Sequence, residues 1–305
     1  MRRKPLTQLG IASALALLVC ANQGVGQTLT HRYSFNDTAG SLSFVDSVGG
    51  ASWNGSLVGA ANLDGTSLQL DGFGSFATVP GGMISGATQV TLEFWASFSP
   101  LNPIWTRVFS FGDQDGVGNK VTGLDYCHYA GGNWQNLGLT TGAGNVWANN
   151  PGGLNGVDNV HVTVVVDPGN NQLYYYNGTK VTSNPGVNGG TTPPLSGLND
   201  TLGLLGKSLI DADATLAGAI DEFRVYTGVL SAARVAINHA AGPNNYVSDP
   251  GAIQAVHLAS PDNPLVVNQN SQQTFSGDFA NVSGVDLVLY GGATFTSGNK
   301  AILTV

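Results

Sequence analysis

Asp221, in the strand-like segment 218–226, is a carboxylate at a position where burial of a charge is energetically unfavourable. Successive side chains of a strand point to opposite faces. By this parity Asp221 shares an apolar face with Ala219, Phe223 and Val225. The other face is polar and is predicted to be wet, with the side chains Glu222, Arg224 and Tyr226. A charge on an apolar face must be hydrogen-bonded, ion-paired or metal-bound, so Asp221 is expected to have such a partner.

A pair of acids that could hydrolyse glycans is not evident. Such a pair flanks the scissile bond about 5–9.5 Å apart, but the only glutamates, Glu93 and Glu222, belong to no Glu-x-Asp-x-x-Glu or Glu-x-Asp-x-Glu arrangement. Glu93 is interpreted as a strand-surface residue beside Trp95, and Cys127 as a buried thiol. The sequence also lacks Gly-x-Ser-x-Gly and His-Glu-x-x-His motifs. We therefore expect no catalytic residues.

A stretch rich in aromatic and amide side chains, 126–136, is the candidate for recognition. Aromatic faces stack on the C–H faces of sugars, and amides pair with hydroxyl groups. The alternative is that these are ordinary core and rim aromatics. The predicted ligand-binding residues are Tyr126, Asn133, Trp134 and Asn136.

The composition excludes several classes of partner. The 305 residues carry a formal net charge of −8, which disfavours nucleic acid and anionic membrane surfaces. Residues 1–26 have a basic start and a short apolar run, which predicts a signal peptide and a secreted or cell-surface protein. No later segment is long and apolar enough to span a membrane. Without the signal peptide only Cys127 remains, so no intrachain disulfide is expected.

Period-2 alternation recurs along the chain, as at 90–98 and 160–167, and turn residues separate the runs. One short helix is predicted over 232–240, with Ser231 as its N-cap and Leu230 and Val235 as a hydrophobic staple. Many strands with one helix predict an all-β protein, a two-sheet sandwich or jelly roll. A polar segment with prolines, 242–250, is expected to be a linker.

Short motifs in a fixed order resemble the laminin-G-like, concanavalin A-like jelly-roll family: HRYSF at 31–35, DSVG at 46–49, LQLDG at 68–72, and GAIDEFRVY at 218–226 followed by LSAA. This resemblance implies a jelly-roll domain over 27–241. It also implies a structural Ca²⁺ where the first and last strands meet, with Asp221, Asp46 and Asp71 as candidate ligands, since hard cations prefer several oxygens. The tail, 251–305, resembles the start of a bacterial Ig-like module and is expected to be an incomplete one.

The sequence thus predicts a secreted, non-catalytic binding or adhesion module that recognises glycans or extracellular surface proteins and holds a structural calcium ion. A competing hypothesis is the ancillary, carbohydrate-binding part of a larger secreted carbohydrate-active enzyme. A standalone glycosidase is disfavoured by the missing acid pair.

Overall fold

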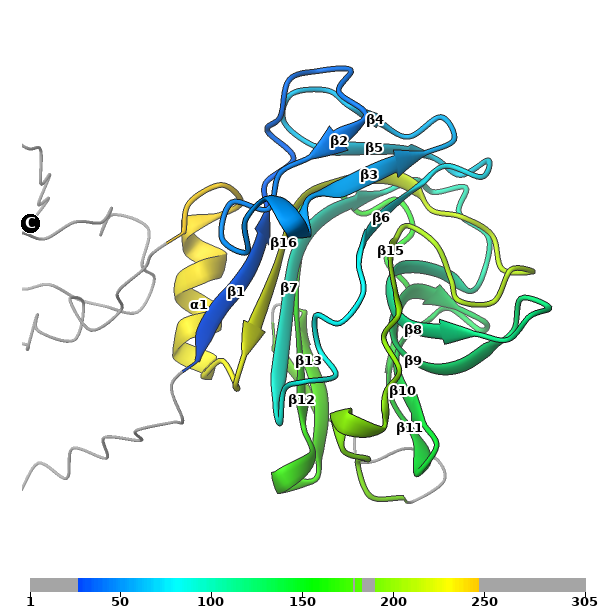
Figure 1. The fold of residues 1–305 in the computed structure, drawn as a ribbon, viewed down its shortest axis with the longest axis vertical. Helices are drawn as coiled ribbons and strands as arrows, with labels where there is room; N and C mark the ends of the chain where they lie inside the picture. The colour runs from blue at the N-terminus through cyan, green and yellow to red at the C-terminus, as the bar shows by residue number, and fades with distance from the viewer. Residues whose placement is uncertain (1–26, 178, 183–189, 247–305) are drawn as a thin grey trace, which may run out of the picture.

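The computed structural model describes residues 27–177, 179–182 and 190–246. In this part of the chain two antiparallel sheets pack face to face, with one short helix outside them (Figure 1). The predicted concanavalin A-like jelly-roll sandwich is thereby confirmed. The predicted signal peptide (1–26), the end of the linker (247–250) and the Ig-like module (251–305) lie outside the described residues.

The first sheet, sheet A, carries the helix on its outer face. Its strand order is β14-β13-β12-β7-β16-β5-β4, and β1 also pairs with β16. The strands are β1 (Thr28–Tyr33), β4 (Asn62–Leu63), β5 (Leu68–Asp71), β7 (Val90–Phe98), β12 (Val160–Asp167), β13 (Gln172–Asn177), β14 (Thr179–Thr182) and β16 (Ala217–Thr227).

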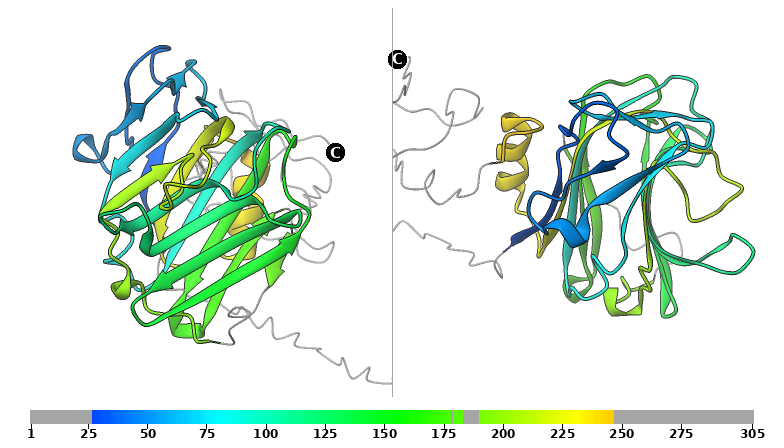
Figure 2. Two further views of the ribbon diagram at one scale, coloured as in Figure 1. Left: turned by 90° about the vertical axis from the view of Figure 1, so that its right-hand side faces the viewer. Right: turned by 45° about the horizontal axis from the view of Figure 1, so that its top comes forward.

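The second sheet, sheet B, has the order β11-β10-β9-β8-β15-β6-β3-β2. Its outer face is turned toward the viewer in the left panel of Figure 2, where no α-helix of the described residues lies on it. The strands are β2 (Ser43–Phe44), β3 (Gly55–Val58), β6 (Phe76–Pro80), β8 (Thr106–Gln114), β9 (Lys120–Ala130), β10 (Trp134–Thr141), β11 (Gly144–Pro151) and β15 (Leu202–Leu205); the short 3-10 turns are η1 (Ala51–Trp53), η2 (Pro168–Asn170) and η3 (Leu195–Gly197).

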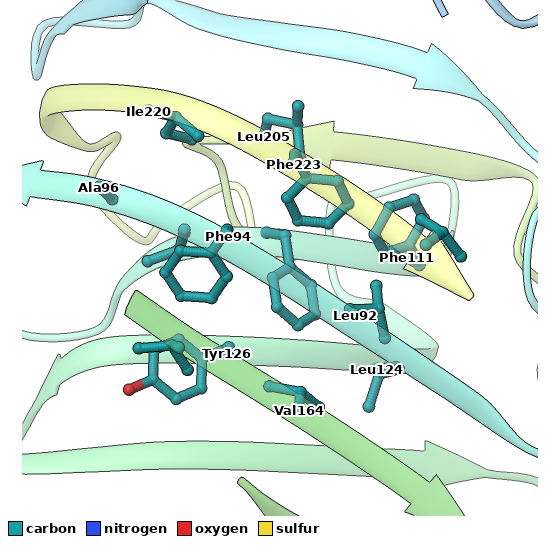
Figure 3. Close-up of a cluster of buried hydrophobic side chains, with 14 of the residues drawn as sticks. Leu92, Phe94, Ala96, Phe111, Leu124, Tyr126, Val164, Leu205, Ile220 and Phe223 are labelled. Atoms are coloured by element: carbon teal, nitrogen blue, oxygen red, sulfur yellow. The ribbon is translucent and has the colours of Figure 1, made fainter. Parts of the chain in front are cut away.

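Aromatic rings from both sheets fill the space between them (Figure 3). Phe94 of β7 lies 5.5 Å, between ring centroids, from Tyr126 of β9 and 6.5 Å from Phe223 of β16. Such rings bury large apolar areas and favour tilted or offset contacts, so this cluster holds the two sheets together.

A β-bulge in β16 changes which residues face the core. The pairing of β16 with β7 shifts between Ile220 and Glu222, which leaves Asp221 as the extra residue. Ile220 and Phe223 consequently both lie in the core. The predicted core face is right for Phe223 and Val225 but wrong for Ala219 and Asp221, because one inserted residue reverses the alternation before it. Asp221 lies half-buried at the bulge rather than on the apolar face.

The helix α1 (Ala232–Ala241) begins as predicted. The Ser231 hydroxyl accepts a hydrogen bond from the backbone N–H of Arg234 at 3.1 Å, which satisfies one free donor of the first turn. Leu230 and Val235 pack together against sheet A in one apolar cluster with Tyr226. None of the helices in the described ranges is long and apolar enough to cross a bilayer.

The polar face of β16 is buried under α1 rather than wet, which corrects the sequence prediction. Glu222, Arg224 and Tyr226 are all buried, as is Glu93 on the neighbouring strand β7. The sequence pattern shows strand parity, but it does not show that a helix will cover the polar side of the sheet.

A buried histidine makes stability dependent on pH. The ring of His128 stacks on Phe98 at 4.2 Å between centroids, and its Nε2 lies 2.9 Å from Asn155 Oδ1. Burial lowers its pKa from 6.5 to about 4. The unfolded chain therefore binds the proton first, and the free energy of unfolding should fall by about 3 kcal/mol as pH drops from 6.5 to 4.

Urea denaturation at several pH values checks this prediction, with His128→Gln as the variant. Glutamine keeps an amide that can pair with Asn155 but does not titrate. The variant should lose less stability than the original chain between pH 6.5 and 4. Equal losses in the two proteins would show that His128 is not the titrating group.

Candidate functional site

A hollow of about 450 Å³ opens on the outer face of sheet B. Three tryptophans and two asparagines line it around the backbone of 130–131, and we call it the tryptophan hollow. Its side chains come from the β10–β11 hairpin and from the residue before β8: Trp134, Asn136, Trp147, Asn149 and Trp105.

Strand parity and register bring the hairpin residues together. Leu137 and Ala148 point into the core, so their neighbours along β10 and β11 point outward. Asn136 lies opposite Asn149 across the hairpin, and Trp147 lies opposite Gly138. A Cβ atom at Gly138 would lie 3.7 Å from Asn136 Oδ1 and from Asp125 Oδ1, at ordinary van der Waals contact, so this glycine lies directly beside the Asn136 amide.

The two amides form a pair with spare hydrogen-bonding capacity. Asn136 Nδ2 donates to Asn149 Oδ1 at 2.6 Å. Within the described ranges Asn136 Oδ1 and Asn149 Nδ2 make no further hydrogen bond, so the pair offers one acceptor and one donor group to a ligand. The tryptophan rings and this amide pair together form an amphipathic surface.

Trp105 closes the hollow from the β7–β8 connection in an unusual backbone conformation. Its φ is 68°, in the left-handed region that bulky side chains rarely adopt. The Trp105 N–H donates to the carbonyl of Tyr129 at 2.8 Å, and its own carbonyl accepts from Arg107 Nη1 at 2.6 Å. Residues held in sparsely populated conformations cluster at functional sites, and the ring stays 40% exposed at the hollow.

The structure brings together only some of the predicted ligand-binding residues. Trp134 and Asn136 line the tryptophan hollow. Tyr126 is wrong as a ligand contact, because its ring is 0% exposed and its hydroxyl donates to Gln135 inside the protein. Asn133 has a φ of 63°, and its Oδ1 accepts from the N–H of Gly153, which fixes the turn beside Trp134.

Three of the five tryptophan and asparagine side chains that line the hollow, Trp105, Trp147 and Asn149, were missed by sequence reasoning. Trp147 and Asn149 belong to β11, which was not predicted because its asparagines, glycine and proline hide the alternation. The alternating outward residues at 145, 147 and 149 were the available signal. Cys127, in contrast, is a buried thiol as predicted, and burial raises its pKa to about 11.

The carboxylate of Asp46 is already fully hydrogen-bonded. Its Oδ2 accepts from His31 Nδ1 at 2.7 Å, and its Oδ1 accepts the backbone N–H groups of Arg32, Val48 and Gly49 at 2.7–3.0 Å. Burial raises the pKa of Asp46, but these donors outweigh it and lower the pKa. An oxygen atom that accepts N–H groups offers little to a cation, so Asp46 does not fit a calcium site.

The other two predicted ligands lie apart from each other. Asp71 is exposed, accepts hydrogen bonds from Ser75 and the N–H of Phe73, and lies opposite Ala217. This register puts it four residues, roughly 13 Å, from Asp221 along β16. The side chain of Asp221 makes no hydrogen bond or ion pair with another described residue, and its pKa is raised by burial and then by the charge of Asp64. No group of three metal-ligating side chains occurs in the described ranges.

Both glutamates are locked into a buried network under α1, so Glu93 is not the surface residue predicted. His161, Arg224, Tyr226 and Asn238 all contact the Glu93 carboxylate at 2.9–3.3 Å. Burial raises the pKa of Glu93, but His161 and Arg224 outweigh it, and the pKa is lowered.

Glu222 binds two arginines within the same network. It accepts from Arg32 Nε at 2.7 Å and from Arg224. Trp95 is buried here too, stacked on His161 at 4.3 Å between centroids. It is therefore closed to a sugar.

Comparison with known proteins agrees with this architecture. A laminin-G-type family model, described as the concanavalin A-like lectin/glucanases superfamily, matches residues 71–236. The sequence matches none of the curated proteins with which it was compared.

Among solved structures, domain 4 of AbnA, a GH43 extracellular arabinanase from Geobacillus stearothermophilus in complex with arabinotriose, is similar with a TM-score of 0.50. It is 20% identical over 68% of this chain and 97% of that chain. Trypanosoma rangeli sialidase in complex with sialic acid also has a TM-score of 0.50, at 15% identity, over 68% of this chain and 32% of the sialidase. The chain therefore spans about a third of that enzyme, and both likenesses concern the fold.

Proposed function

Because the chain belongs to the concanavalin A-like lectin/glucanases superfamily, we propose that it is a glycan-binding module that holds its ligand in the tryptophan hollow. The observation that carries this proposal is the grouping of three tryptophans around a hydrogen-bonded asparagine pair on a sheet face without a helix. The volume of about 450 Å³ falls within the usual range of small-molecule sites.

The mechanism of recognition follows from the two kinds of side chain. Indole faces offer apolar area at low cost in conformational entropy, and the C–H face of a sugar ring can stack on them. Asn136 Oδ1 and Asn149 Nδ2 then accept from and donate to sugar hydroxyls. Stacking supplies most of the affinity in this scheme, and the amides fix the orientation of the ring.

The proposed setting is a secreted or surface-bound protein in which this module is ancillary to carbohydrate chemistry. The similar arabinanase domain supports it, since that domain belongs to an extracellular enzyme and is seen with arabinotriose. Both glutamates of this chain sit in buried ion pairs, which supports a binding rather than a hydrolytic role.

A binding screen of the full chain against oligosaccharides and insoluble polysaccharides tests the proposal. Binding to at least one glycan, weakened in Trp147→Ala, is the expected result. Phe73→Ala serves as the matched control, since Phe73 is an exposed aromatic outside the hollow. Absence of binding to every glycan, or equal weakening in both variants, would refute the proposal.

We also propose that a structural calcium ion is held at Asp221 rather than at Asp46 or Asp71. The support is that the half-buried Asp221 side chain has no hydrogen bond or ion pair among the described residues, whereas the carboxylates of Asp46 and Asp71 already accept hydrogen bonds. EDTA should then lower the melting temperature by several degrees, and Asp221→Asn should abolish that difference. An unchanged melting temperature under EDTA, with no metal found by elemental analysis, would end the calcium proposal.

A further inference from the structure

The charges beside the tryptophan hollow cancel one another, and this bears on which glycans the hollow accepts. The residues that line it are tryptophan, asparagine, alanine and glycine, and none of these carries a charge. The inference drawn below rests on the proposed glycan-binding function and adds a substrate class to it.

Arg107 is the cation that touches the wall of the hollow. Its guanidinium carbon lies 5.6 Å from the centroid of the Trp105 ring. Each nitrogen of that guanidinium lies near a protein oxygen: Nε donates to Asp125 Oδ1 at 2.7 Å, Nη1 donates to the Trp105 carbonyl at 2.6 Å, and Nη2 lies 3.8 Å from Asp213 Oδ2 in an ion pair. Since Arg107 is also only 5% exposed and its charge is paired with Asp125 and Asp213, it is shielded from a ligand in the hollow.

The second cation nearby is neutralised in the same way. Lys120 Nζ donates to Asp125 Oδ2 at 2.7 Å, so both oxygens of Asp125 are paired. Burial raises the pKa of Asp125, but the charges of Lys120 and Arg107 outweigh it and keep the carboxylate ionised. Two cations and two carboxylates thus form a closed group next to the hollow.

A carboxylated or sulfated sugar would lose hydration in this hollow without gaining a charged partner. Desolvating an anion is costly unless a charge-assisted bond replaces the water, and arginine is the usual donor. The net charge of −8 for the chain adds an unfavourable long-range term. We therefore propose that the tryptophan hollow selects uncharged glycans and rejects acidic ones.

Matched neutral and acidic ligands test this selectivity on the full chain. Suitable pairs are fully methyl-esterified and de-esterified homogalacturonan, and asialo and sialylated forms of one oligosaccharide. In at least one pair the neutral member should bind at least tenfold more tightly, with an affinity that changes less than twofold between 20 and 500 mM NaCl.

A charge placed in the hollow should reverse the preference. Asn149→Lys is expected to improve binding of the acidic member several-fold at low salt. Asn145→Lys adds the same charge four residues away on β11, outside the lining, and should not do so.

The outcomes separate the two proposals. Equal or tighter binding of acidic members by the original chain would overturn the selectivity while leaving glycan binding in place. Equal gains in the two lysine variants would also overturn it. Failure of both members of every pair and of all other glycans to bind would overturn the glycan-binding function itself.

Discussion

Replacing Glu93 by glutamine should lower the free energy of unfolding by about 3–5 kcal/mol, the largest stability loss expected from any single substitution named for this protein. The carboxylate is 0% exposed and contacts groups from β12, β16 and α1. An amide in its place removes the charge that compensates Arg224. It also turns one acceptor into a donor that faces the Asn238 amide.

Thermal unfolding of Glu93→Gln measures this loss. At about 2–4 °C per kcal/mol for a domain of this size, the melting temperature should fall by about 10 °C. Asp211→Asn is the control, because Asp211 pairs with Lys207 on the surface, where ion pairs contribute little. A fall similar to that of the control would show that the network under α1 does not support the fold.

The pH dependence of Glu93→Gln adds an independent check. The folded pKa of Glu93 lies below its unfolded value of 4.5, so its contribution to stability is present above pH 4.5 and is lost as pH falls through the lower, folded value. The variant lacks this titration. Its melting temperature should therefore decline less steeply with acid than that of the original chain.

Trp134→Ala should weaken glycan binding by about 30-fold, the largest loss of affinity expected for this chain. Removing a well-placed tryptophan from a binding site costs about 2 kcal/mol or more, and 1.4 kcal/mol is a factor of ten. The side chain is 40% exposed at the hollow and lies outside the core, so the fold should tolerate its removal.

Isothermal titration with a glycan found in the screen measures this effect. Asn133→Gly is an informative companion, because glycine accepts the left-handed backbone of Asn133 but lacks the side-chain oxygen that accepts from Gly153. It should weaken binding less than Trp134→Ala, through a looser turn. Unchanged affinity in Trp134→Ala would move the site away from the hollow.

Local sequence patterns predicted individual strands and the helix correctly. The alternation at 90–98 and 160–167 identified β7 and β12, and Ser231 identified the start of α1. These signals depend on neighbours in the chain, which a single sequence displays. The motif order of the family supplied the rest of the architecture.

The wrong predictions concern residues whose burial or strand register depends on segments far away in the sequence. Nothing near Glu93 in the sequence shows that α1 will cover it, and the bulge at Asp221 depends on the pairing of β16 with β7. For the same reason only two of the five tryptophan and asparagine side chains of the candidate site were predicted. Trp134 and Asn136 lie in a segment rich in aromatic and amide residues, which the sequence displays. Trp147 joins them only through strand pairing, and Trp105 only through the β7–β8 connection.

The bulge at Asp221 also fixes how β16 sits between its neighbours. Before it, alternation places Ile220 in the apolar core; after it, the same strand turns Glu222 and Arg224 toward α1. Sliding the strand by one residue would point these charges at Phe94 and the other core rings, where they would have no partners. The single extra residue thus fixes the register of β16. A chain lacking Asp221 would either bury a charge in the core or lose the pairing of the strand on one side of the bulge.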